Sequence, residues 1–159
     1  MIPKLRERIV LDTNVCLDLF VFRDPQGLAL LQALQEDGLE AVTRADCRTE
    51  WTLVLAYARL GLAPAAQQAA LGEFDQLLTL LELSNPPPSP LPACSDADDQ
   101  KFLELAAASG ASCLLSKDKA LLKLARRTRK MGLFDIMHPS DWLARREPKS
   151  READAETLQ

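Results

Sequence analysis

Short apolar runs alternate along this chain with amphipathic segments that carry apolar residues at helical spacing. Residues 9–11 and 112–115 form runs without polar alternation, as expected of strands that are covered on both faces. Residues 39–43 and 134–138 are further β-like stretches. Because strands and helices alternate, the pattern predicts an α/β fold in which helices sandwich a mainly parallel central sheet in three layers, α/β/α.

The segments between these strands predict helices with recognisable ends. Asp24 and Pro25 begin one of them, with Asp24 as the N-cap and Pro25 at the first helical position. Gly61 ends another helix, which starts at Arg44. The expected helices span residues 15–22, 25–37, 44–60, 64–83, 100–109, 119–130 and 139–145.

The length of 159 residues fits one domain, which we assign to residues 1–146. Five prolines lie between Ser84 and Ser95. We interpret this stretch as a stiff connector inside the domain, because the sheet needs strands from both sides of it. From residue 147 the chain is polar and lacks aromatic residues, so residues 147–159 are expected to be a disordered tail.

Composition argues against several classes of protein. No apolar run is long enough for a membrane span, and the N-terminus lacks the apolar stretch of a secretory signal. The four cysteines have neither a C-x-x-C spacing nor a nearby histidine, which argues against a zinc site and a disulfide framework. These features predict a cytoplasmic protein with reduced thiols.

Charge is unevenly distributed along the chain. The formal net charge is −4, but residues 117–130 hold seven basic side chains and one acid. A protein that is acidic overall can still present one basic face to nucleic acid. A solvated helix face is the alternative interpretation of this run. The candidates for RNA contact within it are Lys117, Lys119, Lys123, Arg126 and Arg127.

Four acidic residues occupy positions where the expected elements meet. Asp12 and Asp118 follow apolar strands, Asp99 begins a helix, and Glu50 lies on the apolar face of another helix. In a parallel sheet, strand ends and helix starts share one edge, so these carboxylates can converge. Converging carboxylates repel one another unless a cation neutralises them. Oxygen ligands without Cys or His point to Mg²⁺ or Mn²⁺ and to metal-assisted phosphodiester hydrolysis.

Each acid also has an ordinary structural interpretation. An Asp after a strand often forms a turn, and an Asp at a helix start often acts as a cap. Glu50 could pair with Arg44 or Arg48 in a simple salt bridge. From the residues alone, these structural explanations stay open beside the metal site.

The same residues resemble a known family. The resemblance rests on four motifs between residues 8 and 143: Asp12-Thr13-Asn14 after a strand, Glu50, Asp96-x-x-Asp99-Gln-Lys-Phe-Leu, and Ser116-x-Asp118 before a Leu-Leu helix. Together they resemble a PIN domain, and more narrowly the PIN-family toxins of bacterial toxin–antitoxin systems. The resemblance implies a metal-dependent endoribonuclease that a cognate antitoxin holds inactive. It also makes a homodimer plausible.

The resemblance assigns a role to each residue of these motifs. Asp12, Glu50, Asp99 and Asp118 would be the catalytic, metal-binding acids. Asn14 would orient Asp12 or a metal-bound water, Ser116 would support Asp118, and Asp96 would be an outer ligand or only a cap. Lys117 departs from the family pattern, because a glycine is more usual there. This lysine would crowd the loop or add a phosphate contact.

Two other functions are consistent with parts of the pattern. A haloacid-dehalogenase-like phosphatase also begins with a strand and an aspartate, but it needs a second acid where this chain has Asn14. A PIN-like module could also bind RNA or a protein without cutting, although the four retained acids argue against it. A serine hydrolase is disfavoured because no Gly-x-Ser-x-Gly motif is present.

Overall fold

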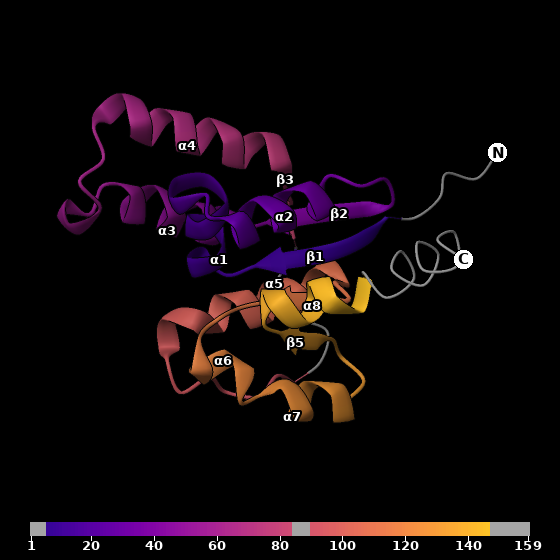
Figure 1. The fold of residues 1–159 in the computed structure, drawn as a ribbon. Helices are drawn as coiled ribbons and strands as arrows, with labels where there is room; N and C mark the ends of the chain where they lie inside the picture. The colour runs from indigo at the N-terminus through magenta and orange to yellow at the C-terminus, as the bar shows by residue number, and fades with distance from the viewer. Residues whose placement is uncertain (1–5, 84–89, 147–159) are drawn as a thin grey trace, which may run out of the picture.

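A parallel five-stranded sheet forms the centre of the molecule, as a computed structural model that describes residues 6–83 and 90–146 shows (Figure 1). The expected tail of residues 147–159 and half of the proline-rich connector lie outside the described residues. The strand order is β3-β2-β1-β4-β5, and every pair is parallel. The strands are β1 (Glu7–Leu11), β2 (Leu39–Thr43), β3 (Leu78–Leu80), β4 (Cys113–Leu115) and β5 (Asp135–Met137). The expected α/β/α architecture is confirmed.

The central position of β1 explains why its sequence is apolar without alternation. Ile9 lies opposite Ala41 of β2 on one side and Cys113 of β4 on the other. Ile9 and Val10 point to opposite faces of the sheet, and both are fully buried. Helices therefore cover both faces of this strand, and its carboxyl end opens toward the loops that carry the acids.

Helices fill the connections between the strands. Short turns of other helix types are η1 (Asp18–Phe22), which is π-helical, and the 3₁₀ turns η2 (Ala58–Leu60) and η3 (Ala97–Asp99). The α-helices are α1 (Thr13–Leu17), α2 (Pro25–Leu34), α3 (Ala45–Leu55), α4 (Pro64–Leu77), α5 (Gln100–Ser109), α6 (Lys119–Leu122), α7 (Ala125–Lys130) and α8 (Pro139–Arg146).

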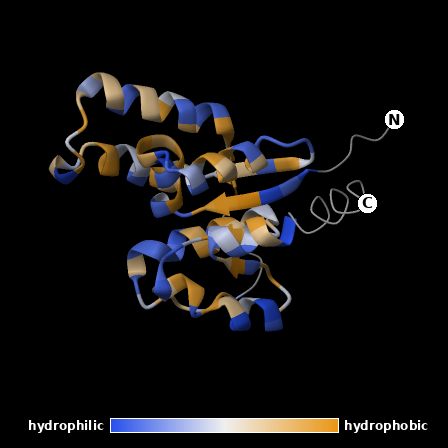
Figure 2. Ribbon diagram, in the orientation of Figure 1, coloured by the Kyte–Doolittle hydropathy of each residue, from blue (hydrophilic) through white to orange (hydrophobic). Residues whose placement is uncertain are grey.

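Two hydrophobic cores lie on the two faces of the sheet. The first joins β1 to α1–α4 and α8 and includes an aromatic cluster, in which the rings of Trp51 and Phe74 stack with centroids 5.6 Å apart and Phe20 meets both edge-on. The second joins Val10 and Leu114 to α5, α6 and α7. In Figure 2, hydrophobic colour covers the carboxyl-terminal half of β1, and the helices carry both hydrophobic and hydrophilic residues.

Five expected helices are shorter or more divided than the sequence pattern indicates. The one expected over 15–22 is divided into α1 and η1, and the one expected over 25–37 ends at Leu34. The helix expected over 64–83 ends at Leu77, and the apolar residues that follow form β3 beside β2. The helix expected over 44–60 ends at Leu55, so Gly61 closes the separate turn η2. The helix expected over 119–130 is divided into α6 and α7. Helical spacing of apolar residues does not reveal such breaks, because both pieces keep one face on the core.

The structure also bears on the expectations about membrane spans and cysteines. Among them, no helix is both long and apolar enough to span a membrane. All four cysteines are free, and Cys16, Cys47 and Cys113 are buried as small core residues.

Candidate metal centre

The carboxyl ends of β1 and β4 bring two of the predicted acids to one edge of the sheet. Asp12 directly follows β1, and its backbone N–H donates to the carbonyl of Leu115 at the end of β4. Asp118 follows β4 and is the N-cap of α6, where its Oδ1 accepts from the N–H of Ala120 at 2.8 Å. The parallel pairing of β1 with β4 therefore places both side chains over the same end of the sheet.

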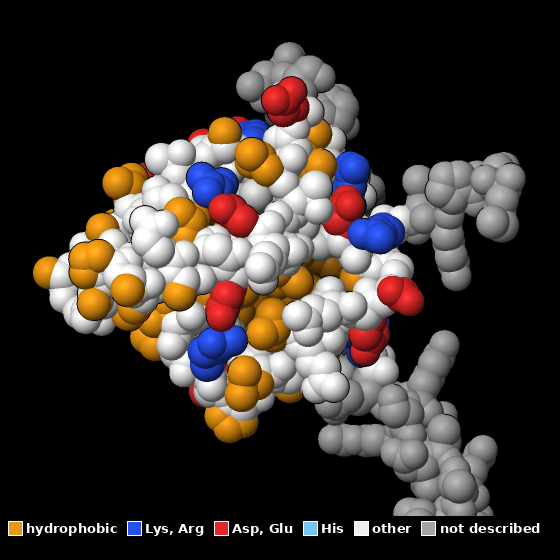
Figure 3. All heavy atoms as spheres, turned by 90° about the horizontal axis from the view of Figure 1, so that it is seen from above, with side chains coloured by type: hydrophobic (Ala, Val, Ile, Leu, Met, Phe, Trp, Pro, Cys, Tyr) orange, Lys and Arg blue, Asp and Glu red, His pale blue; other side chains and the backbone are white. Residues whose placement is uncertain are grey.

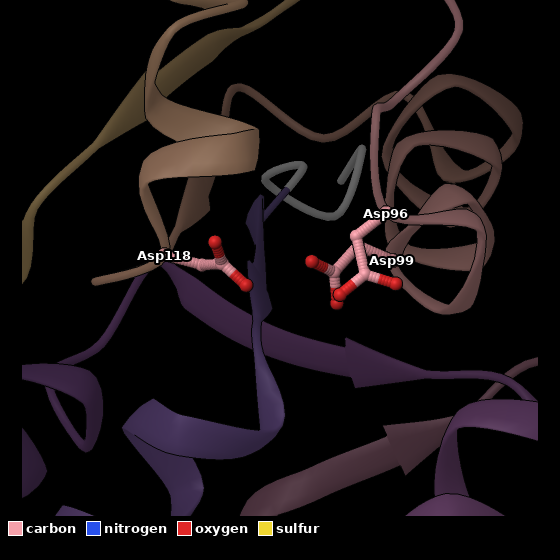
Figure 4. Close-up of side chains that lie close together, drawn as sticks. All are labelled: Asp96, Asp99 and Asp118. Atoms are coloured by element: carbon pink, nitrogen blue, oxygen red, sulfur yellow. The ribbon is translucent and has the colours of Figure 1, made fainter.

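Three aspartates form the tightest cluster of acids among the described residues. Asp96, Asp99 and Asp118 each offer a carboxylate oxygen, and these oxygens lie within 4.8 Å of one another. Asp96 is the N-cap of η3 and Asp99 is its last residue, and both approach Asp118 across the edge of the sheet (Figure 4). Asp96 also caps η3 by accepting from the N–H of Asp98 at 3.0 Å. Asp96 and Asp118 thus both cap a helix and belong to the cluster, whereas the Asp99 side chain makes no capping bond.

A buried serine connects Asp12 to this cluster. The Ser116 hydroxyl donates to Asp12 Oδ2 at 2.7 Å and accepts from the Asp118 N–H at 3.0 Å. Ser116 is fully buried, and Asp12 is 3 % exposed. The hydroxyl fixes the carboxylate of Asp12 relative to the loop that carries Asp118.

The charged forms of two acids are costly in this environment. Burial raises the pKa of Asp12 to about 6, against a lowering by its hydrogen bond to Ser116. Burial, followed by the neighbouring carboxyls of Asp118 and Asp12, raises the pKa of Asp99 to about 8. Asp99 Oδ2 is buried and has no hydrogen-bond partner.

This donor set fits a hard divalent cation. One of the three carboxylates, that of Asp99, has a buried oxygen without a hydrogen-bond partner, and no basic side chain of residues 6–83 or 90–146 forms an ion pair with these three aspartates. All three donors are oxygens, which Mg²⁺ and Mn²⁺ prefer over softer ligands.

Glu50 is outside the three-aspartate cluster, acts electrostatically on Asp12, and is held by other partners. Its Oε2 accepts from the Thr13 hydroxyl, and its Oε1 accepts from the Lys101 ammonium at 2.7 Å. Burial would lower the pKa of Lys101, but its hydrogen bond to Glu50 raises that pKa above its usual value, so the ammonium stays charged. The two partners that the sequence suggested bind other acids instead: Arg44 pairs with Asp46 and Glu104, and Arg48 pairs with Asp75. The expected neighbour on the apolar face, Leu53, is 60 % exposed.

The other expected site residues have different surroundings. Asn14 is exposed, and no hydrogen bond of its side chain to Asp12 is formed in the described structure. Lys117 pairs with Asp18 at 2.6 Å, so its ammonium already has a partner. The remaining RNA-contact candidates, all exposed, are Lys119, Lys123, Arg126 and Arg127.

The sequence pattern did not predict the contacts of three residues in this region. Thr13 lies inside the first motif, but its bond to Glu50 depends on the packing of α1 against α3. Lys101 is part of the helix start after Asp99, and nothing in the local pattern indicates that it reaches Glu50, 51 residues away. Asp18 lies in the π-helical turn η1, which helical spacing does not distinguish from an α-helix.

The fold and the site define an α/β/α protein with an acidic, cation-competent centre at the carboxyl edge of a parallel sheet. A family model described as "PIN domain" matches residues 8–120, and the chain belongs to this family. The match includes every acid discussed above.

One solved structure shares the fold, and the similarity covers almost the whole length of that structure's chain. It is described as the crystal structure of VapBC2 from Rickettsia felis bound to a DNA fragment from their promoter. The similarity has a TM-score of 0.58 at 12 % sequence identity and covers 82 % of this chain and 98 % of that chain. No curated protein matches the chain.

Proposed function

We propose that this protein is a metal-dependent endoribonuclease, the toxin of a toxin–antitoxin pair. The observation that carries the proposal is the buried, unpartnered Oδ2 of Asp99 beside the carboxylates of Asp96 and Asp118. Membership of the PIN domain family supports nuclease chemistry in a site of this kind. The fold shared with the VapBC2 structure supports the toxin–antitoxin assignment.

The proposed ion is Mg²⁺ or Mn²⁺. Asp99 and Asp118 would hold it, with Asp12 beside them and Asp96 at the exposed side of the cluster. When bound, the ion would supply activation of the attacking water and charge neutralisation at the leaving oxygen. The Ser116 hydroxyl holds Asp12 Oδ2, and the N–H of Ala120 holds Asp118 Oδ1. Both carboxylates are therefore oriented before any substrate arrives.

The substrate proposal rests on the basic run beside this edge of the sheet. Lys119 begins α6 directly after Asp118, and Lys123, Arg126 and Arg127 continue along α6 and α7. In the described structure these four side chains form no ion pair, so they are free to contact an RNA backbone. Lys117, paired with Asp18, would contribute a phosphate contact only after leaving that carboxylate.

A protein partner belongs to the same proposal. Large hydrophobic side chains are exposed near the α3–α4 connection, among them Leu53 and Tyr57. Seen from above, hydrophobic side chains gather at the end of the molecule where α3 and α4 connect (Figure 3). Exposed apolar groups of this kind favour a protein contact, either with a cognate antitoxin or within a homodimer. An RNA substrate and four free cysteines are consistent with a cytoplasmic location.

A catalytically silent PIN module that binds RNA or protein is the second candidate. The exposed position of Asn14, without a carboxylate there, argues further against a phosphatase of the haloacid-dehalogenase kind. The silent module and the nuclease differ in one property, namely whether RNA is cut when a divalent ion is present.

The test is cleavage of mixed RNAs by the full chain with Mn²⁺ or Mg²⁺, with and without EDTA. We expect cleavage only with the ion, and we expect Asp99→Asn to lose at least a hundredfold in rate. Glu104→Gln is the matched control, because Glu104 lies on α5 and pairs with Arg44 away from the cluster. RNA binding without cutting would establish the silent module, and turnover of p-nitrophenyl phosphate would favour the phosphatase.

A further inference from the structure

The Glu50 carboxylate already has a positive partner inside the protein. Lys101 Nζ lies 2.7 Å from Glu50 Oε1, and the same ammonium donates to the carbonyl of Asp98. The side chains of Lys101 and Glu50 are only 18 % and 25 % exposed. The Thr13 hydroxyl occupies the other oxygen of Glu50. Both oxygens of this acid are therefore committed to donors from α1 and α5.

The three-aspartate cluster is the opposite case. Asp99 Oδ2 is buried without a partner, and one carboxylate oxygen of Asp99 lies within 4.8 Å of an oxygen of Asp96 and one of Asp118. The three aspartates of the cluster thus lack a counter-charge, whereas Glu50 has one in Lys101. An ammonium at 2.7 Å from a carboxylate oxygen fills the position that a metal ion would need at that oxygen, and it repels a second cation nearby.

We propose that Lys101 is a built-in cation that keeps Glu50 out of the metal site, so that the chain binds one divalent ion on the aspartates and no second ion at Glu50. Lys101 is then a positioning residue, which acts through Glu50. The inference rests on the proposed metal centre, and it assigns Glu50 a role different from that of Asp99 and Asp118.

The geometry around Lys101 explains how a flexible side chain can be held in this role. Its residue lies on the first turn of α5, two positions after Asp99, and its stem passes the ring of Phe102, with Nζ 5.4 Å from the ring centroid. The carbonyl of Asp98 and the carboxylate of Glu50 accept from the ammonium on two sides. The Lys101 side chain thus connects the start of α5 to Glu50 on α3.

The test is the number and affinity of Mn²⁺ ions bound by the full chain, measured by isothermal titration calorimetry without RNA. We expect wild type to bind one Mn²⁺ per chain. Glu50→Gln should leave the dissociation constant within about threefold, whereas Asp99→Asn should weaken binding at least tenfold. A tenfold loss in Glu50→Gln, or two ions bound by wild type, would overturn the inference.

Charge replacement at position 101 gives the second arm of the experiment. Lys101→Met frees Glu50, so we expect either a second Mn²⁺ or at least tenfold tighter binding of the first. Lys101→Arg keeps the charge and should behave as wild type, and the double variant Lys101→Met/Glu50→Gln should return to one ion. Lys130→Met on α7 is the matched control, since Lys130 is exposed and remote from Glu50. Unchanged Mn²⁺ binding in Lys101→Met would contradict the proposal.

Loss of folding and loss of the proposed function are distinguishable from these results. Lys101→Met leaves a half-buried carboxylate without a counter-charge and lowers stability, whereas the double variant removes both charges and should recover the stability. Thermal melting of each variant checks this order. One Mn²⁺ bound without RNA cleavage would remove the nuclease proposal but leave the role of Lys101 intact. Cleavage with two bound ions would do the reverse.

Discussion

The side chains at the sheet edge act through specific hydrogen bonds, and Ser116 has two of them. It connects Asp12 Oδ2 to the backbone of Asp118 from a fully buried position. We expect Ser116→Ala to weaken Mn²⁺ binding by roughly 10- to 100-fold, because partners that orient metal ligands typically have effects of this size. Calorimetry measures the change.

A matched control exists for this variant. Ser109→Ala also removes a buried hydroxyl, but Ser109 lies at the end of α5 away from the acids, so Mn²⁺ affinity should stay unchanged. If Mn²⁺ binding weakens equally in both variants, the loss comes from general destabilisation and not from the missing hydrogen bond to Asp12.

The pKa of Asp99 makes the stability of the ion-free protein depend on pH. The folded-state pKa of about 8 lies above the ordinary 3.8, so folding disfavours the charged carboxylate. This cost is absent below pH 4, grows between pH 4 and pH 8, and is complete above pH 8. Asn is neutral at every pH. We therefore expect Asp99→Asn to stabilise the ion-free protein by on the order of 2 kcal/mol at pH 8, a value reduced by water that reaches the site.

The measurement is urea unfolding with EDTA at pH 4.5 and pH 8. The advantage of Asp99→Asn should shrink strongly at the lower pH, where wild-type Asp99 is already protonated in the folded protein. A gain that is the same at both values would contradict the raised pKa. Added Mn²⁺ should reverse the order at pH 8, because only wild type keeps the ligand.

At the scale of elements, α2 approaches the π-helical turn η1 through a glycine. A Cβ built on Gly27 would lie 2.4 Å from the carbonyl oxygen of Asp18, which is closer than real Cβ contacts allow. We expect Gly27→Ala to destabilise the fold by about 1–3 kcal/mol, the usual cost of overpacking. In urea unfolding the midpoint should fall.

Gly72 is the control for this substitution. It lies inside α4, and a Cβ there would meet nothing within 4 Å. Gly72→Ala should therefore raise stability by roughly 0.5–1 kcal/mol through helix propensity alone. Opposite signs at the two glycines would confirm the close contact of α2 with η1, and a stabilising Gly27→Ala would refute it.

Element by element, the sequence predicts what local patterns control. β1, β2, β4 and β5 follow from apolar runs, and Asp24 does cap α2 by accepting from the N–H of Gly27 at 2.6 Å. β3 escapes prediction because its three residues continue the apolar spacing of α4, and only the free edge of β2 makes them a strand. For the site, strand ends and helix starts locate three aspartates, whereas the Lys101–Glu50 pair depends on tertiary packing.

At the scale of the whole molecule, a basic surface on α6 and α7 lies beside an acidic centre in a chain of net charge −4. If RNA follows this surface, binding must depend on salt. We expect the triple variant Lys123→Gln/Arg126→Gln/Arg127→Gln to lower the slope of log K against log salt by about 2, at roughly 0.7 for each lost phosphate contact with a single strand.

Binding is measured by fluorescence anisotropy on an Asp99→Asn background, so that the RNA stays intact. Arg59→Gln is the control, because Arg59 lies near the α3–α4 connection and stacks over Tyr57. Its slope should equal that of the parent. An unchanged slope in the triple variant would mean that the basic run is a solvated helix face.

The pairing of β1 with β4 also sets the moment at which the acidic site is complete. Ser116 lies 104 residues after its partner Asp12, and the chain is made from its N-terminus. At about 5–20 residues per second, a ribosome needs roughly 5 to 20 seconds to add that length. Throughout this time the nascent chain sits beside the messenger that encodes it without a complete set of carboxylates. If the protein is the nuclease proposed above, it therefore cannot cut its own message until synthesis of the domain is almost finished.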